Sequence, residues 1–273
     1  MKKKIILITG ASSGIGKASA IKLLKEGHIV YGASRRVGKM KELEDLGGQV
    51  LEMDVTEYET ISKGIERIIK DHDRIDVLFN NAGFGLYGPV ETLSIEQAKY
   101  QFEVNLFGLA RATQLVLPHM RKQGSGLIMN TSSAGGRIYS PLGAWYHASK
   151  HAVEGWSDCL RIELQQFGIH VVVIEPGLID TEITSVLVGP MTESTRNNAY
   201  QDMADKIEAA LSKLGPQKKL SPPSVIADIV AEAVNATKPK TRYLAGKRAK
   251  TSIFIRKWFG DRVFDRIIMS RIK

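Results

Sequence analysis

A glycine-rich turn near the start of the chain constrains the fold more than any other feature. The apolar run 4–9, rich in β-branched residues, precedes it and is typical of a strand buried on both faces of a parallel sheet. Apolar residues at helical spacing follow from Ala18 to Leu24. In such a unit the glycines let backbone approach a pyrophosphate, and the helix N-terminus supplies free N–H groups. We therefore predict a phosphate-binding element formed by Gly10, Ser12, Ser13, Gly14, Ile15 and Gly16.

The glycine spacing in this turn is Gly-x-x-x-Gly-x-Gly, which differs from the common Gly-x-Gly-x-x-Gly dinucleotide fingerprint. An ordinary glycine-rich β–α turn is the alternative interpretation. The strand before the turn and the helix after it favour the phosphate-binding element.

Short apolar strands and amphipathic helices alternate along the rest of the chain. This alternation predicts a single α/β domain with a doubly wound parallel sheet of about seven strands and helices on both faces. We expect this domain to span residues 1–246, with a polar stretch at about 183–224 that has a helical piece near 203–214. The further strands expected are 28–33, 49–53, 75–80, 126–131, 170–175 and 242–245, and the further helices are 61–70, 96–122 and 146–167.

Tyr146 and Lys150 stand four residues apart in a predicted helix, so their side chains share one face. An ammonium beside a phenol favours the phenolate and should lower the tyrosine pKa from about 10. A tyrosine tuned in this way can give or take a proton. A solvated helix face is the alternative interpretation of the pair.

Several motifs occur in one order along residues 4–182. They are Thr9-Gly10-Ala11-Ser12-Ser13-Gly14-Ile15-Gly16, Asn80-Asn81-Ala82-Gly83, Asn105, Ser133 placed 13 residues before Tyr146, Tyr146 with Lys150, and Pro176-Gly177. Together they resemble the short-chain dehydrogenase/reductase family in its classical form. The resemblance implies a Rossmann-type fold and an oxidoreductase that interconverts a carbonyl and a secondary alcohol. It also implies that the polar stretch at about 183–224 forms a mobile lid over the substrate.

The resemblance also implies a role for each catalytic candidate. Tyr146 would protonate the substrate oxygen, and Lys150 would lower its pKa and bind the nicotinamide ribose. Ser133 would donate a hydrogen bond to the oxygen on which negative charge develops. Asn105 would help hold a water that extends the proton relay from Lys150. A tolerated helix-interior asparagine and a plain strand-end serine are the alternatives for Asn105 and Ser133.

Further residues would contact the cofactor if the resemblance holds. Asp54 and Val55 would meet the adenine, although Asp54 could instead cap the helix that begins near Thr56. The ribose contact would come from Asn81, with Ala82 and Gly83 beside it. The nicotinamide carboxamide would be held by Pro176, Gly177, Ile179 and Thr181, although a plain turn also uses Pro-Gly.

The end of the second strand discriminates between NAD and NADP. An acidic residue there would bind the ribose hydroxyls and repel a 2′-phosphate, but this chain has Ser34 followed by Arg35 and Arg36. Both arginines can form charge-assisted hydrogen bonds with a phosphate, and Arg35 could stack on adenine. We predict NADP(H) as the cofactor, with a solvated basic loop as the alternative.

Composition limits the remaining function classes. The single cysteine, Cys159, allows no internal disulfide, so we expect a reducing, cytoplasmic location and a thiol packed in the core. No His/Cys cluster indicates a metal site, and we expect His147 to be a solvated or interface residue. Residues 247–273 carry nine basic and two acidic residues and so supply +7 of the net charge of +9. The nearly balanced body argues against a nucleic-acid partner.

The segment 247–273 is a basic amphipathic extension that we expect to form one or two helices. We favour its packing against the lid or another subunit, with weak contact to a membrane surface as the alternative. Such a tail resembles those of hydroxysteroid and retinol dehydrogenase-like members of the family. The helices 96–122 and 146–167 are those that the family pairs in homodimers and homotetramers, here through candidates Ala110, Leu115, Leu117, Ala152, Val153, Trp156 and Leu160.

A small hydrophobic carbonyl or alcohol is the substrate class that these patterns favour. The expected lining is mostly apolar and comprises Gly135, Tyr139, Leu142, Trp145, Leu178, Val186, Leu187 and Met191. Two alternatives stay open: a 3-oxoacyl reductase within the enzyme class, and a cofactor-binding regulatory or scaffold protein that has lost turnover. The basic tail disfavours the first, and the presence of all four catalytic candidates disfavours the second.

Overall fold

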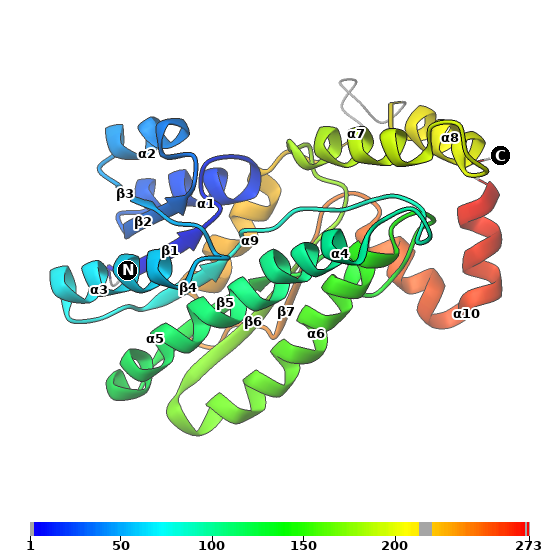
Figure 1. Ribbon diagram of the computed structural model, residues 1–273. Coiled ribbons are helices and arrows are strands. Elements are labelled where there is room, and N and C mark those ends of the chain that lie inside the picture. Colours follow the sequence, from blue (N-terminus) through cyan, green and yellow to red (C-terminus); the bar gives the residue numbers. More distant parts are fainter. Residues whose placement is uncertain (1–2, 213–219, 271, 273) are drawn as a thin grey trace.

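The computed structural model describes residues 3–212, 220–270 and 272, and it is built around one seven-stranded sheet (Figure 1). All pairs are parallel, in the order β3-β2-β1-β4-β5-β6-β7, which confirms the doubly wound α/β fold predicted from the sequence. The strands are β1 (Ile5–Thr9), β2 (Ile29–Ser34), β3 (Gln49–Glu52), β4 (Val77–Asn80), β5 (Gly126–Thr131), β6 (Ile169–Pro176) and β7 (Arg242–Ala245).

Helices cover both faces of this sheet (Figure 1). One apolar core lies under α1 (Gly14–Lys25) and α9 (Ser224–Asn235), with α2 (Lys41–Asp45) and a short 3₁₀ turn (Val37–Met40) beside it. A second core lies under α3 (Tyr58–His72), α5 (Leu109–Gln123) and α6 (Ala144–Leu164). Strands β1 and β4 contribute to both cores because their successive side chains alternate between the two faces. This burial on both faces explains their nearly continuous apolar sequences.

The strand order reverses between β1 and β4, and this reversal positions the site. Crossovers from β1 run toward β2 and β3, whereas those from β4 run toward β5, β6 and β7. The loops that leave the carboxyl ends of β1 and β4 therefore diverge and leave a crevice between them, which is where ligands bind in open α/β sheets.

The helix predicted at 96–122 is present but not uniform. It consists of α4 (Ile95–Phe102), a π-helical segment (Glu103–Gly108) and α5, and it ends at Gly124 with φ 64°. π-Helical turns inside α-helices occur frequently at functional sites. Here the segment contains Asn105, one of the predicted site residues.

The region beyond β6 holds more helix than the sequence indicated. Between β6 and β7 lie α7 (Ile183–Thr195), α8 (Gln201–Ser212) and α9, of which α7 and α9 were not predicted. Residues 213 and 214 of the expected helical piece lie outside the described residues. The C-terminal helix α10 (Ala249–Ser270) is broken at Gly260, where φ is 74°, as expected for two amphipathic pieces. None of the helices within residues 3–212 and 220–270 has the length and apolarity needed to cross a bilayer.

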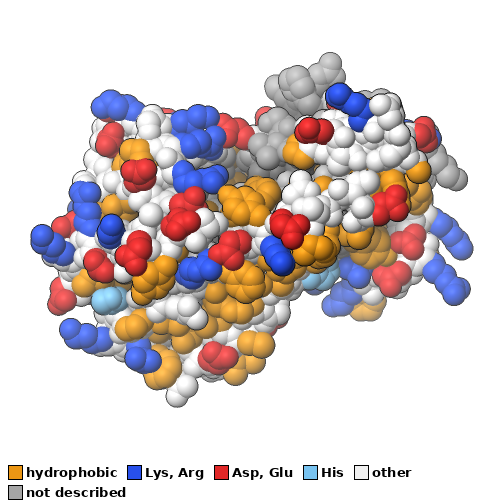
Figure 2. Space-filling model, in the orientation of Figure 1, with side chains coloured by type: hydrophobic (Ala, Val, Ile, Leu, Met, Phe, Trp, Pro, Cys, Tyr) orange, Lys and Arg blue, Asp and Glu red, His pale blue; other side chains and the backbone are white. Residues whose placement is uncertain are grey.

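Two interface and core expectations change in the structure. Cys159 is exposed on α6, so the prediction of a core thiol is wrong; Leu160, the next residue along the helix, is the one turned to the core. Val153 and Leu160, two of the candidates for subunit pairing, are buried within the subunit. Phe107 in the π-helical segment and Ile162 on α6 are instead 49% and 67% exposed. An apolar band follows α4, α5 and α6 on the surface (Figure 2).

Candidate active site

A cavity of about 780 Å³ lies at the carboxyl ends of the strands. Its polar half is lined by the glycine-rich turn, the end of β2 and the loop after β4, and its apolar half reaches α8 and the end of α10. Of the predicted site residues it is lined by Gly10, Ser12, Ser13, Gly14, Ile15, Arg35, Arg36, Asp54, Val55, Asn81, Ala82, Gly83, Ser133, Tyr146, Lys150, Pro176, Gly177, Ile179 and Thr181. Asn105 and Gly16 lie behind this wall.

The glycine-rich turn adopts the backbone that a phosphate-binding element needs. Gly10 and Gly14 have φ values of 68° and 52°, a region that other residues rarely adopt. The N-cap of α1, Ser13, makes no side-chain capping bond, so the first N–H groups of the helix keep their capacity for a ligand. A Cβ on Gly16 would come within 2.3 Å of the Gly10 carbonyl oxygen, so this glycine permits close packing inside the turn.

Thr9 and Asn81 lock the turn to the loop after β4. The Thr9 hydroxyl accepts hydrogen bonds from the N–H groups of Asn81 and Ala82, at 3.0 and 3.1 Å. In return, the Asn81 amide donates to the carbonyl groups of Thr9 and Gly10, at 3.1 and 3.3 Å. The two loops that flank the crevice are therefore held at a fixed separation. Sequence reasoning missed Thr9 as a member of this link.

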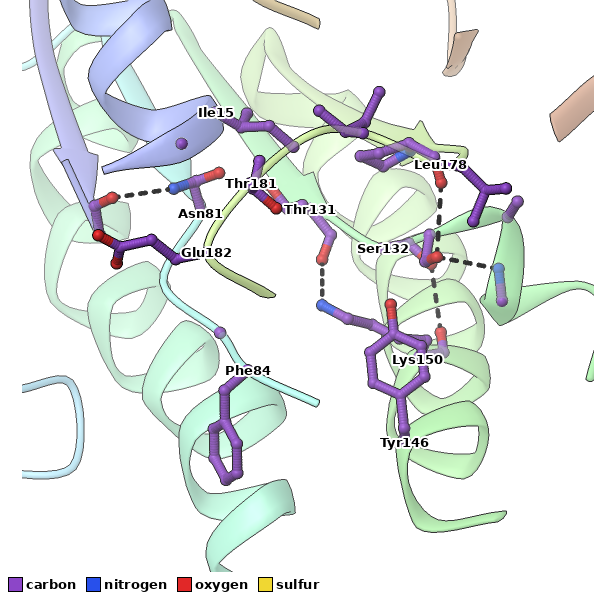
Figure 3. Close-up of a pocket in the computed structure, with 18 of the residues that line it drawn as sticks. Ile15, Asn81, Phe84, Thr131, Ser132, Tyr146, Lys150, Leu178, Thr181 and Glu182 are labelled. Atoms are coloured by element: carbon purple, nitrogen blue, oxygen red, sulfur yellow. Dashed lines mark hydrogen bonds between the residues drawn. The ribbon is translucent and has the colours of Figure 1, made fainter. Parts of the chain in front are cut away.

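Arg36 extends along the mouth of the turn (Figure 3 shows its acidic partner, Glu182, at the same end of the cavity). Its guanidinium donates to the hydroxyl oxygens of Ser12 and Ser13, at 3.2 and 2.9 Å, and forms an ion pair with Glu182 at 3.0 Å. Lys39 binds the same carboxylate at 3.3 Å. The Glu182 carboxylate is thus held by two cations, and one of them, Arg36, also binds two hydroxyls of the turn. Cations and hydroxyls of this kind form a donor set that suits a phosphate group. Neither Lys39 nor Glu182 was predicted.

Arg35 has different surroundings from Arg36. Its guanidinium is 3.3 Å from the Tyr100 hydroxyl and 3.6 Å from the Asp54 carboxylate, and its side chain is 65% exposed. The other Asp54 oxygen accepts hydrogen bonds from the Thr56 N–H and hydroxyl, at 3.0 and 2.8 Å. Asp54 therefore supports the turn before α3 and also lines the cavity, but it does not cap this helix, whose N-cap is Glu57.

Tyr146 and Lys150 project from α6 toward the end of β5, where Thr131, Ser132 and Ser133 follow one another (Figure 3). The Lys150 ammonium donates to the Thr131 carbonyl at 2.8 Å. The Ser133 hydroxyl accepts from the Gly135 N–H at 3.0 Å and reaches the Pro176 carbonyl at 3.4 Å. The predicted tyrosine, lysine and serine therefore converge on one side of the cavity.

The electrostatics of this group differ from the sequence-based expectation. Burial raises the pKa of Tyr146, and the neighbouring Ser133 hydroxyl opposes this change only in part. The prediction that Lys150 would bring the tyrosine pKa below 10 is therefore wrong for the protein alone, because desolvation dominates and Lys150 is not among the groups that shift this pKa. Burial also lowers the pKa of Lys150 to about 8, while Glu154 acts to raise it.

A buried carboxylate pair lies behind Lys150. Glu154 and Glu175 are 8% and 1% exposed, and Arg242 bridges them at 3.1 and 3.5 Å. Burial, followed by repulsion from Glu154, raises the pKa of Glu175 to about 7. Arg242 also binds Asp158 at 2.7 Å, which ties α6 to β7. Sequence reasoning missed this cluster because its members come from α6, β6 and β7.

Asn105 acts on the backbone of the loop after β4. Its side-chain oxygen accepts from the Phe84 N–H at 3.0 Å, and its amide donates to the Phe84 carbonyl at 3.0 Å and to the Ser149 hydroxyl at 3.1 Å. A Cβ on Gly83 would lie 3.0 Å from the Asn105 oxygen and 3.6 Å from the Lys150 nitrogen. Asn105 thus positions the loop beside Lys150, and the predicted water-holding role stays a prediction.

His147 is buried, so the expectation of a solvated or interface residue is wrong. Its Nδ1 atom lies 2.8 Å from the Gly135 carbonyl and its Nε2 atom lies 3.0 Å from the Ser140 hydroxyl. Burial lowers the pKa of His147, which favours a neutral ring that donates through Nδ1 and accepts through Nε2. The Tyr87 ring packs against Tyr146 at 5.6 Å, and burial raises the Tyr87 pKa. His147 and Tyr87 therefore support the Ser133 loop and the Tyr146 ring.

The apolar arm of the cavity agrees only partly with the predicted lining. Gly135, Tyr139, Leu178 and Met191 line it, whereas Leu142 and Trp145 do not. The side chains of Val186 and Leu187 lie outside the described residues. The wall that sequence reasoning missed comes from three separate segments and consists of Ile138, Ile207, Ala210, Leu211, Leu220, Ile268 and Ile272.

The region predicted to form the lid contains α7 and α8, and hydrogen bonds tie its two ends together. The Asp180 N–H donates to the Ser221 carbonyl at 2.8 Å, and the Ser221 N–H donates to the Leu178 carbonyl at 3.1 Å. Met191 on α7 is buried at 1% exposure and faces the cavity. Between these ends, α7 and α8 contribute Met191, Ile207 and Leu211 to the cavity lining. That this region forms a lid which excludes water from the reacting groups stays a prediction.

Comparison with known families gives a direct match. The family model described as short chain dehydrogenase matches residues 4–189. The solved structure of a short-chain dehydrogenase from Streptomyces avermitilis superposes with a TM-score of 0.81 at 29% identity, covering 94% of this chain and 97% of that one.

Two curated proteins show the kinds of activity found among relatives. A 3-ketodihydrosphingosine reductase from Bacteroides thetaiotaomicron is 44% identical over 185 residues, which are 67% of each chain. An NADPH-dependent 3-dehydrocapnine reductase from Ornithobacterium rhinotracheale is 33% identical over 287 residues, covering 98% of this chain and 96% of that protein.

Proposed function

The chain belongs to the short-chain dehydrogenase family, and from that premise we propose that it reduces a ketone on a long apolar chain to a secondary alcohol with NADPH. The observation that carries this proposal is the continuity of one cavity. At one end it places Tyr146, Lys150 and Ser133 beside the cofactor-binding loops, and at the other it has an apolar wall.

The proton chemistry follows from the positions of the three polar side chains. Tyr146 would donate its proton to the carbonyl oxygen, and the raised pKa keeps this phenol protonated at neutral pH. Ser133 would turn its hydroxyl from the 3.4 Å contact with Pro176 to the same oxygen and stabilise its developing charge. Lys150 would hold its ammonium between Thr131 and the ribose side of the cavity.

NADP(H) fits the residues of the polar half. The turn with Gly10 and Gly14 and the open N-terminus of α1 would hold the pyrophosphate. Arg36, together with the hydroxyls of Ser12 and Ser13, would hold the 2′-phosphate in the place now taken by the Glu182 carboxylate. Bound NADPH would supply the hydride. The NADPH dependence named for the Ornithobacterium relative supports this choice.

The adenine and nicotinamide contacts are part of the same proposal. Asp54 and Val55 would flank the adenine, with Arg35 free to lie over its ring. The ribose would meet Asn81, Ala82 and Gly83. The carboxamide would be held by the loop with Pro176, Gly177, Ile179 and Thr181, all four of which line the cavity.

The substrate class rests on the apolar arm and on the relatives. Ile207 and Leu211 on α8 and Ile268 on α10 line the far end of the cavity, beyond the catalytic group. Both curated relatives are named as reductases of a 3-keto or 3-dehydro compound, and 3-ketodihydrosphingosine carries its ketone near the head of a long alkyl chain. A flexible alkyl chain would gain about 0.8 kcal/mol for each methylene that it buries in such an arm.

Turnover of 3-ketodihydrosphingosine under NADPH tests the proposal, with dihydrosphingosine identified by mass spectrometry. We expect product with NADPH and far less with NADH at equal concentration. A short methyl ketone provides the matched comparison for the apolar arm. Binding of NADPH without turnover of any ketone in the series would contradict the proposal and favour a regulatory role.

A further inference from the structure

Three aromatic side chains stand exposed together on the first half of α10. Phe254, Trp258 and Phe259 are 56%, 67% and 58% exposed. The Phe254 ring lies 6.3 Å from the rings of both Trp258 and Phe259. Large apolar side chains that are exposed next to one another in this way mark an interaction site.

The helix that carries this aromatic cluster also carries exposed cations. Lys250, Lys257, Arg262 and Arg266 are exposed on α10, and none of them takes part in an ion pair within the described part of the chain. The Lys257 ammonium lies 5.5 Å from the centre of the Trp258 ring. Basic side chains also project from the side of the molecule where α10 lies (Figure 2). The surface thus combines exposed rings with uncompensated positive charge.

The two acidic residues of α10 do not neutralise this face. Asp265 accepts a hydrogen bond from the Tyr139 hydroxyl at 2.8 Å, and Asp261 lies 3.4 Å from Arg256. Arg256 itself is 4.6 Å from the centre of the Tyr139 ring and donates to the Arg137 carbonyl at 2.7 Å. Both carboxylates are therefore engaged where the helix meets the body.

The sequence spacing separates an inner from an outer face. Lys250, Phe254 and Trp258 follow at intervals of four residues and share the outer face. Ala249 and Ile253 are buried against Ala134. Phe264, after the break at Gly260, is also buried, and its ring lies 5.2 Å from that of Tyr139. The outer face is therefore presented by a helix that its inner face fixes in place.

The same helix forms a wall of the substrate cavity. Ile268, in the second half of α10, and Ile272 just beyond it line the apolar arm, as does Ser252 in the first half. The helix also runs close to the end of α8 in Figure 1, where both enclose this arm. A surface that engages α10 from outside would hold the far end of the cavity next to itself.

We infer that the outer face of α10 docks on the surface of an anionic lipid bilayer. Phe254, Trp258 and Phe259 would enter the interfacial region, and the exposed cations of the helix would meet lipid phosphates. A second copy of the chain fits less well, because a two-fold contact would place the cations of one copy against the same cations of the other. Docking goes beyond the proposed function and is measured without turnover, so the two can fail separately.

Vesicle flotation of the full chain tests the inference. We expect binding to vesicles of phosphatidylcholine containing phosphatidylglycerol, and much weaker binding to phosphatidylcholine alone. Combined Phe254→Ala, Trp258→Ala and Phe259→Ala should reduce the partition coefficient by more than about tenfold, because the buried apolar area is lost. Each of Lys250→Gln and Lys257→Gln should cost about fivefold, and added salt should weaken binding.

Matched controls come from an exposed aromatic and an exposed lysine on α3. Tyr58→Ala and Lys63→Gln should leave vesicle binding unchanged, and all variants should retain the NADPH affinity of the parent as a check on folding. Equal binding of the triple variant and the parent would overturn the inference. Absence of vesicle binding by the parent would also overturn the inference. If the triple variant then lost a dimer that the parent forms, the face would be assigned to a second copy.

Trp258 offers a direct readout of depth. Lipids brominated near the headgroup should quench the fluorescence of the bound parent protein, and Trp258→Phe should remove most of this quenching while Trp145 and Trp156 remain. Quenching that persists in Trp258→Phe would contradict insertion through this face.

Discussion

The polar and apolar halves of the cavity are built in different ways. In the polar half each functional group is set by a short local motif at the carboxyl end of a strand, and hydrogen bonds such as those of Thr9 and Asn81 lock neighbouring loops together. In the apolar half the wall is assembled from α7, α8 and α10, which are separate helices and contribute one to three lining residues each. Under the proposed function, the polar half would carry out the hydride chemistry and the apolar half would determine substrate choice.

Replacement of Tyr146 should have the largest effect and is confined to the polar half. Tyr146→Phe removes the proposed proton donor and should lower kcat by about a hundredfold to ten-thousandfold, with NADPH affinity nearly unchanged. Tyr87→Phe is the control, because the ring of Tyr87 packs on Tyr146 at 5.6 Å but has no proposed role in proton transfer. Steady-state kinetics of both variants, with NADPH binding followed by fluorescence, measure the difference. Retained turnover in Tyr146→Phe would remove the tyrosine from the mechanism.

The two arginines after β2 provide the next largest contrast. Arg36→Ala should weaken NADPH binding by about tenfold to a hundredfold through loss of charge-assisted hydrogen bonds, and should leave NADH binding nearly unchanged. Arg35→Ala should change NADPH binding by less than about threefold, since its 65% exposed side chain lies toward Asp54 and Tyr100. Fluorescence titration with both cofactors separates the two. The reverse order of effects would move the phosphate site to Arg35.

A bulky side chain in the apolar half should affect substrate choice alone. Leu211→Trp fills the far end of the cavity and should raise KM for a long-chain ketone by about tenfold, equivalent to roughly two buried methylenes. The KM for a short ketone and the affinity for NADPH should stay the same. Ala209→Trp, at an exposed position on the same helix, is the matched control. A similar loss with both ketones would show that this arm does not hold the chain.

The Glu182 carboxylate stands directly before α7 and binds Arg36 and Lys39 in the polar half. A 2′-phosphate would have to replace it at Arg36. Glu182→Gln should therefore tighten NADPH binding by about twofold to fivefold, in line with the small free energy of an exposed ion pair. NADH titration is the control and should show no change. Weaker NADPH binding would mean that the carboxylate supports the site.

The smallest expected effect is a shift of the pH profile. With the Lys150 pKa at about 8, reduction should decline as pH rises through this value and the ammonium is lost. Glu154 raises that pKa, so Glu154→Gln should move the alkaline limb to lower pH. Asp158→Asn disturbs the same Arg242 contact but is absent from the groups that act on Lys150, and it should leave the limb in place. Identical limbs in all three proteins would exclude Glu154 as a modulator.

The sequence predicted the polar half closely for a physical reason. Gly10 and Gly14 have to adopt positive φ, and Tyr146 and Lys150 have to share a helix face, so local residue types reveal their roles. The alternation of strands and helices predicted all seven strands and the long helices by similar local rules. The subdivision of the helix around Asn105 could not be predicted, because it depends on the bonds of that side chain to Phe84.

What escaped prediction depends on residues that meet only in three dimensions. The Glu154–Glu175 pair forms where α6 crosses β6, and His147 is buried because its ring reaches Gly135 and Ser140. The sign of the Tyr146 pKa shift was wrong for the same reason, since helix spacing revealed the charge of Lys150 but not the extent of burial. Local patterns do not report desolvation.

Transfer of deuterium from NADPH labelled at the nicotinamide C4 position tests the central claim most directly. With 3-ketodihydrosphingosine as substrate, we predict one deuterium at the carbon that bears the new hydroxyl, and no detectable transfer in Tyr146→Phe over the same period. Product formed by the parent without label at that carbon, or equal transfer in the variant, would contradict hydride reduction with Tyr146 as the proton donor.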